Sequence, residues 1–169
     1  HAEIFQREIG NNEWIKDHLS GAQQTGEYRI TGEFSYRNRY CSTDGLVLAG
    51  DALGFLDPVF SSGVFLALKS GVMLADEIDS IMASGTPITS ASFDRYGKRM
   101  QSSIEIMRKI VYAFYDENFS FGSLVKRGEH LRSSLTDCLI GNVDDQDFRE
   151  LFEAMSDLAE LPEPVDCGL

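Results

Sequence analysis

The residues best able to do chemistry lie in one stretch, Gly50–Gly71, which reads GDALGFLDPVFSSGVFLALKSG. Asp51 follows a short apolar run, and ligands of open α/β sheets sit beyond the carboxyl ends of strands. Its ionised carboxylate offers two oxygens that accept hydrogen bonds from sugar-like hydroxyls. Gly50, directly before it, leaves space for a ligand to approach the backbone. The spacing therefore favours a site for a polyhydroxylated ligand at Asp51.

A second feature of this stretch is Ser61–Gly63, where the next helix is predicted to begin. The first backbone N–H groups of a helix lack intrahelical partners and lie at the positive end of the helix dipole. They favour an anion or an electron-rich carbonyl. The residues alone leave an alternative open, because Asp51 and the serines are also consistent with local caps in an ordinary strand, turn and helix. In that case the segment binds no ligand.

Two strands are predicted before the motif. Residues 27–37 alternate between apolar and polar side chains, which is typical of an antiparallel strand with one wet face. Residues 46–49 are continuously apolar, as in a strand buried on both faces of a parallel sheet. Two sheet environments so close together indicate that the chain crosses from one domain to another.

Helices are predicted from apolar residues at spacings of three and four. Two short helices come first, broken at Asn11–Asn12. A long helix spans about residues 63–84 and ends at Gly85. Another starts near Thr89 or Ser90, and an acidic helix ends before Pro162 and Pro164. These last two carry the stripes Phe93, Tyr96, Met100, Ile104, Met107, Val111 and Phe114, and Phe148, Leu151, Phe152, Met155 and Leu158.

Charge and hydropathy narrow the classes of partner. Among 169 residues, 15 Lys and Arg stand against 27 Asp and Glu, which gives a formal net charge of −12. This charge repels phosphate backbones and anionic membranes, so we expect no nucleic-acid partner. No stretch reaches the roughly 18 apolar residues that a membrane-spanning helix needs. Three widely spaced cysteines (Cys41, Cys138 and Cys167) fit reduced thiols, and hence a cytoplasmic protein.

Few side chains favour a metal site. His18 and His130 are isolated, and His1 is terminal. The acidic cluster Asp144, Asp145 and Asp147 lacks the glycine and the closing glutamate of a calcium loop. We therefore expect no metal, and we interpret the cluster as the solvated start of the last helix.

The motif resembles the second flavin motif of FAD-dependent halogenases and of their relatives, the geranylgeranyl reductases and aromatic hydroxylases. Residues 57–64, DPVFSSGV, are similar to the halogenase version in particular, because hydroxylases usually carry a glycine-richer loop after the proline. The flanking segments GEFSYR (32–37), FDRY (93–96) and YAFYD (112–116) resemble further parts of that family, so that the resemblance covers about residues 19–143.

The resemblance implies a role for each motif residue. Gly50 and Asp51 are expected at the ribityl chain of FAD, and Pro58, Gly63 and Val64 at the edge of the isoalloxazine. The halide is expected at the backbone N–H groups of Ser62 and Gly63, because amides at a helix start suit a small anion.

The resemblance also implies what this chain lacks. It has no GxGxxG after a strand, the fingerprint that normally opens the FAD domain and holds the pyrophosphate. Lys69 lies inside a predicted helix and is not the family's catalytic lysine. We therefore expect a mainly α fold with a small β component, the carboxy-terminal part of a two-domain FAD-binding α/β flavoprotein with a glutathione-reductase-type FAD domain. It would carry no catalytic residue of its own.

The domain organisation expected from this resemblance has three parts. Residues 1–37 would end the substrate-domain sheet with its preceding helices, 38–85 would complete the FAD-binding domain, and 86–169 would form a carboxy-terminal helical region. Strands that lack partners would leave exposed edges, which favour a dimer.

The activity implied for the complete enzyme is halogenation of an electron-rich substrate with reduced flavin, oxygen and halide. A flavin reductase and a small-molecule or carrier-bound aromatic substrate would be its partners. Two alternatives remain: a geranylgeranyl-reductase-like or aromatic-hydroxylase-like flavin oxidoreductase, and a non-catalytic helical interaction module without redox chemistry. An aromatic set could line the substrate pocket, although its spacing favours packed core for Phe114; its members are Tyr112, Phe114, Tyr115, Phe119 and Phe121.

Overall fold

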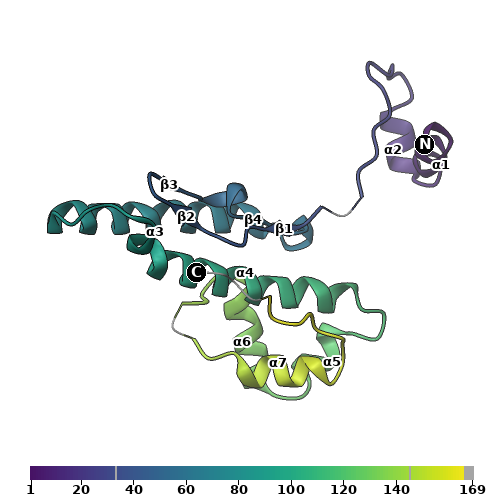
Figure 1. The fold of residues 1–169 in the computed structure, drawn as a ribbon. Coiled ribbons are helices and arrows are strands. Elements are labelled where there is room, and N and C mark those ends of the chain that lie inside the picture. Colours follow the sequence, from purple (N-terminus) through teal and green to yellow (C-terminus); the bar gives the residue numbers. More distant parts are fainter. Residues whose placement is uncertain (33, 145, 166–169) are drawn as a thin grey trace. The chain divides into compact units, whose positions relative to one another are not determined.

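The structure is a computed structural model that describes residues 1–32, 34–144 and 146–165 (Figure 1). It is mainly helical with a small β component, as expected from the sequence. The chain divides into two compact units, His1–Glu33 and Phe34–Leu169. The three functional parts expected from the resemblance stay a prediction.

The first unit contains two short helices, α1 (Ala2–Gly10) and α2 (Glu13–His18). The predicted break between them is confirmed, because the Asn12 side chain accepts a hydrogen bond from the Ile15 amide at 3.0 Å and caps α2. Neither helix contains a buried residue.

The second unit carries two small antiparallel sheets. In the first, β1 (Tyr36–Arg37) pairs with β4 (Gly54–Phe55), with Tyr36 opposite Phe55. In the second, β2 (Ser42–Thr43) pairs with β3 (Leu46–Val47), with Ser42 opposite Val47.

Both strand predictions need correction. Of the strand expected over residues 27–37, the described part is extended in a sheet at Tyr36–Arg37 alone, and Glu33 lies outside the described residues. The run 46–49 forms part of an antiparallel hairpin rather than a strand buried in a parallel sheet, and Leu46 is 57% exposed. A strand is stabilised by hydrogen-bonded neighbours, and no described segment offers such a neighbour to 27–32 or a parallel partner to 46–49.

Both long helices expected from the sequence are present. Helix α3 (Ser62–Ser84) ends at Gly85, whose φ of +66° forms the left-handed cap. A short 3₁₀ turn, η3 (Ser90–Phe93), follows Thr89 and leads into α4 (Asp94–Tyr115). The predicted stripe of α4 is buried from Phe93 to Val111; its members are Phe93, Tyr96, Met100, Ile104, Met107 and Val111.

Phe114 is the exception to this stripe. It is 45% exposed, so the expectation that it packs in the core is wrong. The last turn of α4 extends past the core, and the Phe114 ring meets Phe60 edge-on at a centroid distance of 5.4 Å.

Three shorter helices cover the other side of α4 from α3: α5 (Phe121–Val125), α6 (Glu129–Leu139) and α7 (Arg149–Ser156) (Figure 1). The acidic helix was predicted, whereas α5 and α6 were not. A segment without helix or strand runs from α7 to Val165. No helix in the described part of the chain is long and apolar enough to cross a membrane.

Candidate functional site

The base of the motif is fixed by a buried serine of α3. The Gly50 amide donates a hydrogen bond to Ser70 Oγ at 2.8 Å, and that hydroxyl donates to the Ala67 carbonyl at 2.8 Å. Gly50 has a φ of +53°, a left-handed conformation that glycine adopts without strain. A Cβ at this position would lie 3.4 Å from Ala67 Cβ, so the missing side chain faces the helix. Gly50 thus shapes the turn through its conformation.

A buried tyrosine of α4 holds the residues that lead into this turn. Tyr96 is 1% exposed, and its hydroxyl donates to the Leu48 carbonyl at 2.7 Å. Burial raises the pKa of Tyr96 to about 12; nearby Cys41 adds to this effect and a contact with Ser70 opposes it. The hydroxyl therefore keeps its proton, and both long helices anchor the end of this segment.

The next turn presents the Asp51 carboxylate to solvent. Residues Gly50–Ala52 form a 3₁₀ turn, η1. Its backbone is held by the Tyr36 hydroxyl, which donates to the Asp51 carbonyl, and by the Asn38 side chain, which donates to the Ala52 carbonyl. Asp51 itself is exposed, and within the described chain no hydrogen bond or ion pair engages its carboxylate. The backbone is thus fixed while the side chain can accept hydrogen bonds from a ligand.

A second 3₁₀ turn, η2 (Pro58–Phe60), precedes α3. Asp57 Oδ1 accepts hydrogen bonds from the Val59 amide at 3.1 Å and from the Tyr115 hydroxyl at 2.9 Å. Ser61 then adopts a φ of +55°, in the left-handed region that residues other than glycine rarely occupy. Such a conformation persists where surrounding contacts impose it, and it is frequent at ligand sites.

The start of α3 is open. The Ser61 side chain makes no cap hydrogen bond to the helix, and a Cβ added at Gly63 would meet no atom within 4 Å. Ser62 is 6% exposed, and its hydroxyl is buried without a hydrogen-bond partner among the described residues. Buried polar groups nearly always have a partner, so this hydroxyl is an unsatisfied donor at the start of α3.

The remaining predicted residues lie near the same opening in the chain. Pro58 is exposed on η2, and Val64 is 72% exposed on the first turn of α3. Helix α3 packs against both 3₁₀ turns and so brings the two ends of the motif together.

Several supporting contacts were missed from the sequence. Ser70 and Tyr96 anchor the base of the motif, and Asp57 joins η2 to the end of α4 through Tyr115. An Asp before a proline signals a cap, but its tyrosine partner is 58 residues away and leaves no local pattern.

The aromatic residues do gather beside η2. Phe60 lies 5.4 Å from Phe114 and 6.0 Å from Phe121, measured between ring centroids, and Phe119 meets Phe121 edge-on at 4.9 Å. Tyr112 is about half exposed. The cluster forms an aromatic surface next to the motif.

Lys69 and the acidic cluster have structural roles. Lys69 Nζ pairs with Asp144 at 2.6 Å, and Arg99 reaches the same carboxylate at 3.4 Å. Asp147 accepts a hydrogen bond at 3.0 Å from the amide of Arg149, the first residue of α7, as expected for an acidic residue beside a helix start. Asp145 lies outside the described residues. Across the described ranges, no three His, Cys, Asp or Glu side chains come together as a metal site.

Comparisons with known proteins also match this chain to halogenases. The family model described as tryptophan halogenase matches residues 12–123. The chain is 27% identical over 124 residues, 73% of its length, to a 1H-pyrrole-2-carbonyl-(peptidyl-carrier protein) chlorinase of Pseudomonas fluorescens. It is 28% identical over 151 residues, 89% of its length, to a tryptophan 2-halogenase of Chondromyces crocatus. A flavin-dependent halogenase of Armillaria mellea is 40% identical over 60 residues, which are 36% of this chain and 12% of that protein.

The matched region is a small part of each relative. It covers 27% of the length of the chlorinase and 28% of the length of the tryptophan 2-halogenase. Since the family model matches most of this chain, the chain belongs to the tryptophan halogenase family.

Proposed function

We propose that this chain forms one wall of the flavin and halide site of an FAD-dependent halogenase. The observation that carries the proposal is the Ser62 hydroxyl, buried without a partner at the start of the 23-residue helix α3. It lies within a segment that matches the halogenase family model. A helix start with an unpaired donor suits an anion or an electron-rich carbonyl.

Each motif residue has a role in this proposal. The exposed Asp51 carboxylate accepts hydrogen bonds from the ribityl hydroxyls, and the left-handed turn at Gly50 places it. Pro58, Gly63 and Val64 border the isoalloxazine. The amides of Ser62 and Gly63 hold the halide, and the Ser62 hydroxyl adds a third donor.

The residues present fit such a group, because they combine an acceptor without a partner in the described chain, a helix start without a side-chain cap and an unpartnered buried hydroxyl. Reduced flavin, when bound, supplies the electrons that activate oxygen for oxidation of the halide. The contribution of this chain is to bind and orient the cofactor and to fix the halide. The chain would hold no catalytic residue.

The substrate is proposed to be an electron-rich aromatic compound. One relative is named for a pyrrole-2-carbonyl group on a peptidyl-carrier protein and another for tryptophan. The aromatic surface around Phe60 provides rings against which such a substrate can pack. A flavin reductase would deliver the reduced cofactor.

The test uses the full-length protein with reduced flavin, oxygen and bromide. Phenols, indoles, free pyrroles and a carrier-bound pyrrole-2-carbonyl thioester are supplied in turn, and brominated products are detected by mass spectrometry. We expect a product that requires bromide. A product that forms equally well without bromide would assign the protein to the hydroxylases instead.

A variant of Ser62 tests the halide position. Ser62→Ala removes one donor to a charged ligand, so we expect the KM for bromide to rise roughly tenfold while flavin affinity changes little. Ser80→Ala, at an exposed position of the same helix, is the matched control. An unchanged KM for bromide in Ser62→Ala would show that this hydroxyl does not bind the halide.

For the 169-residue chain alone we expect weak or undetectable FAD binding and no halogenation, because it supplies one part of the cofactor's contacts. Fluorescence titration of FAD measures this. If full-length protein contains no flavin and gains no thermal stability from added FAD, the flavin assignment fails and a helical interaction module becomes the better description.

A further inference from the structure

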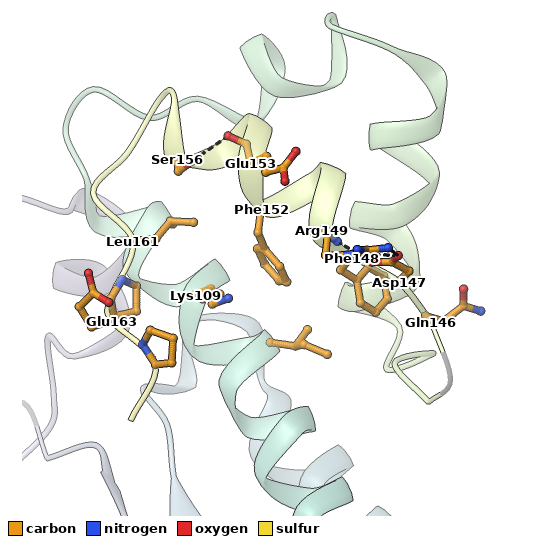
Figure 2. Close-up of a pocket in the computed structure, with 13 residues that line it drawn as sticks. Lys109, Gln146, Asp147, Phe148, Arg149, Phe152, Glu153, Ser156, Leu161 and Glu163 are labelled. Carbon is orange, nitrogen blue, oxygen red and sulfur yellow. Dashed lines mark hydrogen bonds and ion pairs between the residues drawn. The ribbon is translucent and has the colours of Figure 1, made fainter. Parts of the chain in front are cut away.

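A cavity of about 560 Å³ lies between α4, α7 and the segment that follows α7 (Figure 2). Its volume falls within the range of roughly 300–1,000 Å³ typical of small-molecule sites. Its lining contains none of the motif residues Gly50–Val64. Apolar side chains from three elements form its walls, among them Ile106, Phe148, Phe152, Leu161 and Pro162.

The segment that follows α7 forms the outer wall of this cavity, and it is held in place by hydrogen bonds. The Glu160 amide donates to Asp116 Oδ2 at 2.9 Å, and the Arg108 guanidinium donates to the Glu163 carbonyl at 2.5 Å. Arg108 is itself fixed by a salt bridge of 2.7 Å to Glu105. Pro162 restricts the backbone between these two anchors. The wall is therefore formed before any ligand arrives.

A lysine without a counter-charge faces the cavity. Lys109 projects from α4 and Phe152 from α7 toward the same space, with Lys109 Nζ 4.5 Å from the centre of the Phe152 ring (Figure 2). Lys109 is half-buried, and within the described part of the chain no carboxylate lies within ion-pair distance of it. A cation held against an aromatic ring and away from carboxylates can receive an anionic ligand.

The other charged side chains that line the cavity neither attract an anionic ligand nor strongly repel it. The Arg149 side chain donates three hydrogen bonds of 2.6–3.0 Å to Asp147, and this pairing lowers the pKa of Asp147 to about 2. Glu153 and Glu163 are exposed, so water and salt screen their repulsion of an anion. Lys109 is less exposed than either, and its attraction is screened less.

From this arrangement we propose that the α4–α7 cavity binds a small aromatic carboxylate, with its ring against Phe152 and Leu161 and its carboxylate on Lys109. The aromatic walls favour a planar ring, and the ammonium selects an anionic head group. The site is independent of the flavin wall.

Isothermal titration calorimetry of the full-length protein tests this, with 2-naphthoate as the probe. The neutral 2-naphthamide and the cationic 2-naphthylmethylamine have the same ring and serve as comparisons. We expect 2-naphthoate to bind and Lys109→Met to weaken it roughly tenfold, the effect of losing one charge-assisted hydrogen bond. Binding of 2-naphthamide should not change in Lys109→Met.

Two further variants serve as controls for Lys109→Met. Lys98→Met removes an exposed lysine of the same helix outside the cavity and should leave 2-naphthoate binding unchanged. Lys109→Arg should retain most of it. Absence of 2-naphthoate binding to the wild type, equal binding to Lys109→Met and wild type, or tighter binding of 2-naphthylmethylamine would each overturn the proposal.

Discussion

Two serines of α3, eight residues apart, lie at the two ends of the motif. Ser70 lies at its base, beside Gly50, and Ser62 lies where the helix begins. Ser70 is fully buried and satisfied, since it accepts from the Gly50 amide and donates to the Ala67 carbonyl. Ser62 is almost as buried, yet its hydroxyl has no partner in the described chain. The same residue type on the same helix thus has its hydrogen bonds satisfied at one place and left unsatisfied at the other.

This difference indicates how the motif divides its tasks. At the base, hydrogen bonds to Tyr96 and Ser70 attach the backbone to α4 and α3, and they fix the position of the turn. At the opening, the uncapped start of α3 leaves polar groups unpaired. An unsatisfied buried polar group costs about 1–3 kcal/mol of stability, so it is expected where a ligand completes the hydrogen bonds.

Ser70→Ala should have the strongest effect on stability. Loss of the hydroxyl leaves the Gly50 amide without its partner, and we expect the free energy of unfolding to fall by about 2 kcal/mol. Urea denaturation measures the change, with Ser80→Ala as the exposed control. A loss below that of the control would show that Ser70 does not anchor the turn.

The next effect separates two glycines. Gly50→Ala forces a side chain into a φ of +53° and should destabilise the protein by about 1 kcal/mol. Gly71→Ala, in the interior of α3 with open space around it, should stabilise by about 0.5–1 kcal/mol through helix propensity. Equal signs for the two substitutions, in the same denaturation assay, would contradict the role given to the Gly50 turn.

A smaller effect is expected at the opening. Ser62→Ala removes an unpaired buried hydroxyl, so the ligand-free chain should keep its stability or gain up to about 1 kcal/mol. Thermal unfolding without flavin or halide measures this. A marked loss of stability would reveal a partner for the hydroxyl and remove the contrast with Ser70.

The smallest effect concerns a satisfied carboxylate elsewhere. Hydrogen bonds from the Glu160 and Asn118 amides lower the pKa of Asp116. Because the folded pKa lies below the unfolded value of about 3.9, its stabilisation is present above that value and is lost as the pH falls through the folded pKa. Asp116→Asn should therefore be less stable than wild type at pH 6, and the gap should narrow toward pH 2. A constant gap in unfolding midpoints would assign the effect to something other than this ionisation.

Helices were predictable because their signals are local. Apolar spacing located α3 and α4, and Gly85 marked the end of α3. The same rule applied to Leu131, Leu135 and Cys138 would have found α6, whose polar surface hid the pattern. The strand predictions failed because strand pairing depends on residues far from the strand itself. The apolar run 46–49 predicts burial in a sheet, but within the described chain it pairs with β2 in an antiparallel hairpin.

The candidate site was located by the same local logic. Residue types and order singled out Asp51 and the start of α3 as candidates, since a glycine turn and a helix start are short-range features, and the family resemblance gave these residues their expected roles. The unpaired state of Ser62 and the anchoring by Tyr96 depend on residues far apart in the chain and needed the structure. Lys109 was missed for the same reason, because its partner Phe152 lies on another helix.

The most direct test of the flavin wall is the affinity of full-length protein for FAD when Asp51 is changed to Asn, with Asp79→Asn on the exposed end of α3 as the control. Fluorescence titration should show a Kd raised roughly tenfold in Asp51→Asn, because a charge-assisted hydrogen bond to the ribityl chain is weakened, and unchanged in Asp79→Asn. An identical Kd in Asp51→Asn and wild type would contradict the proposed site.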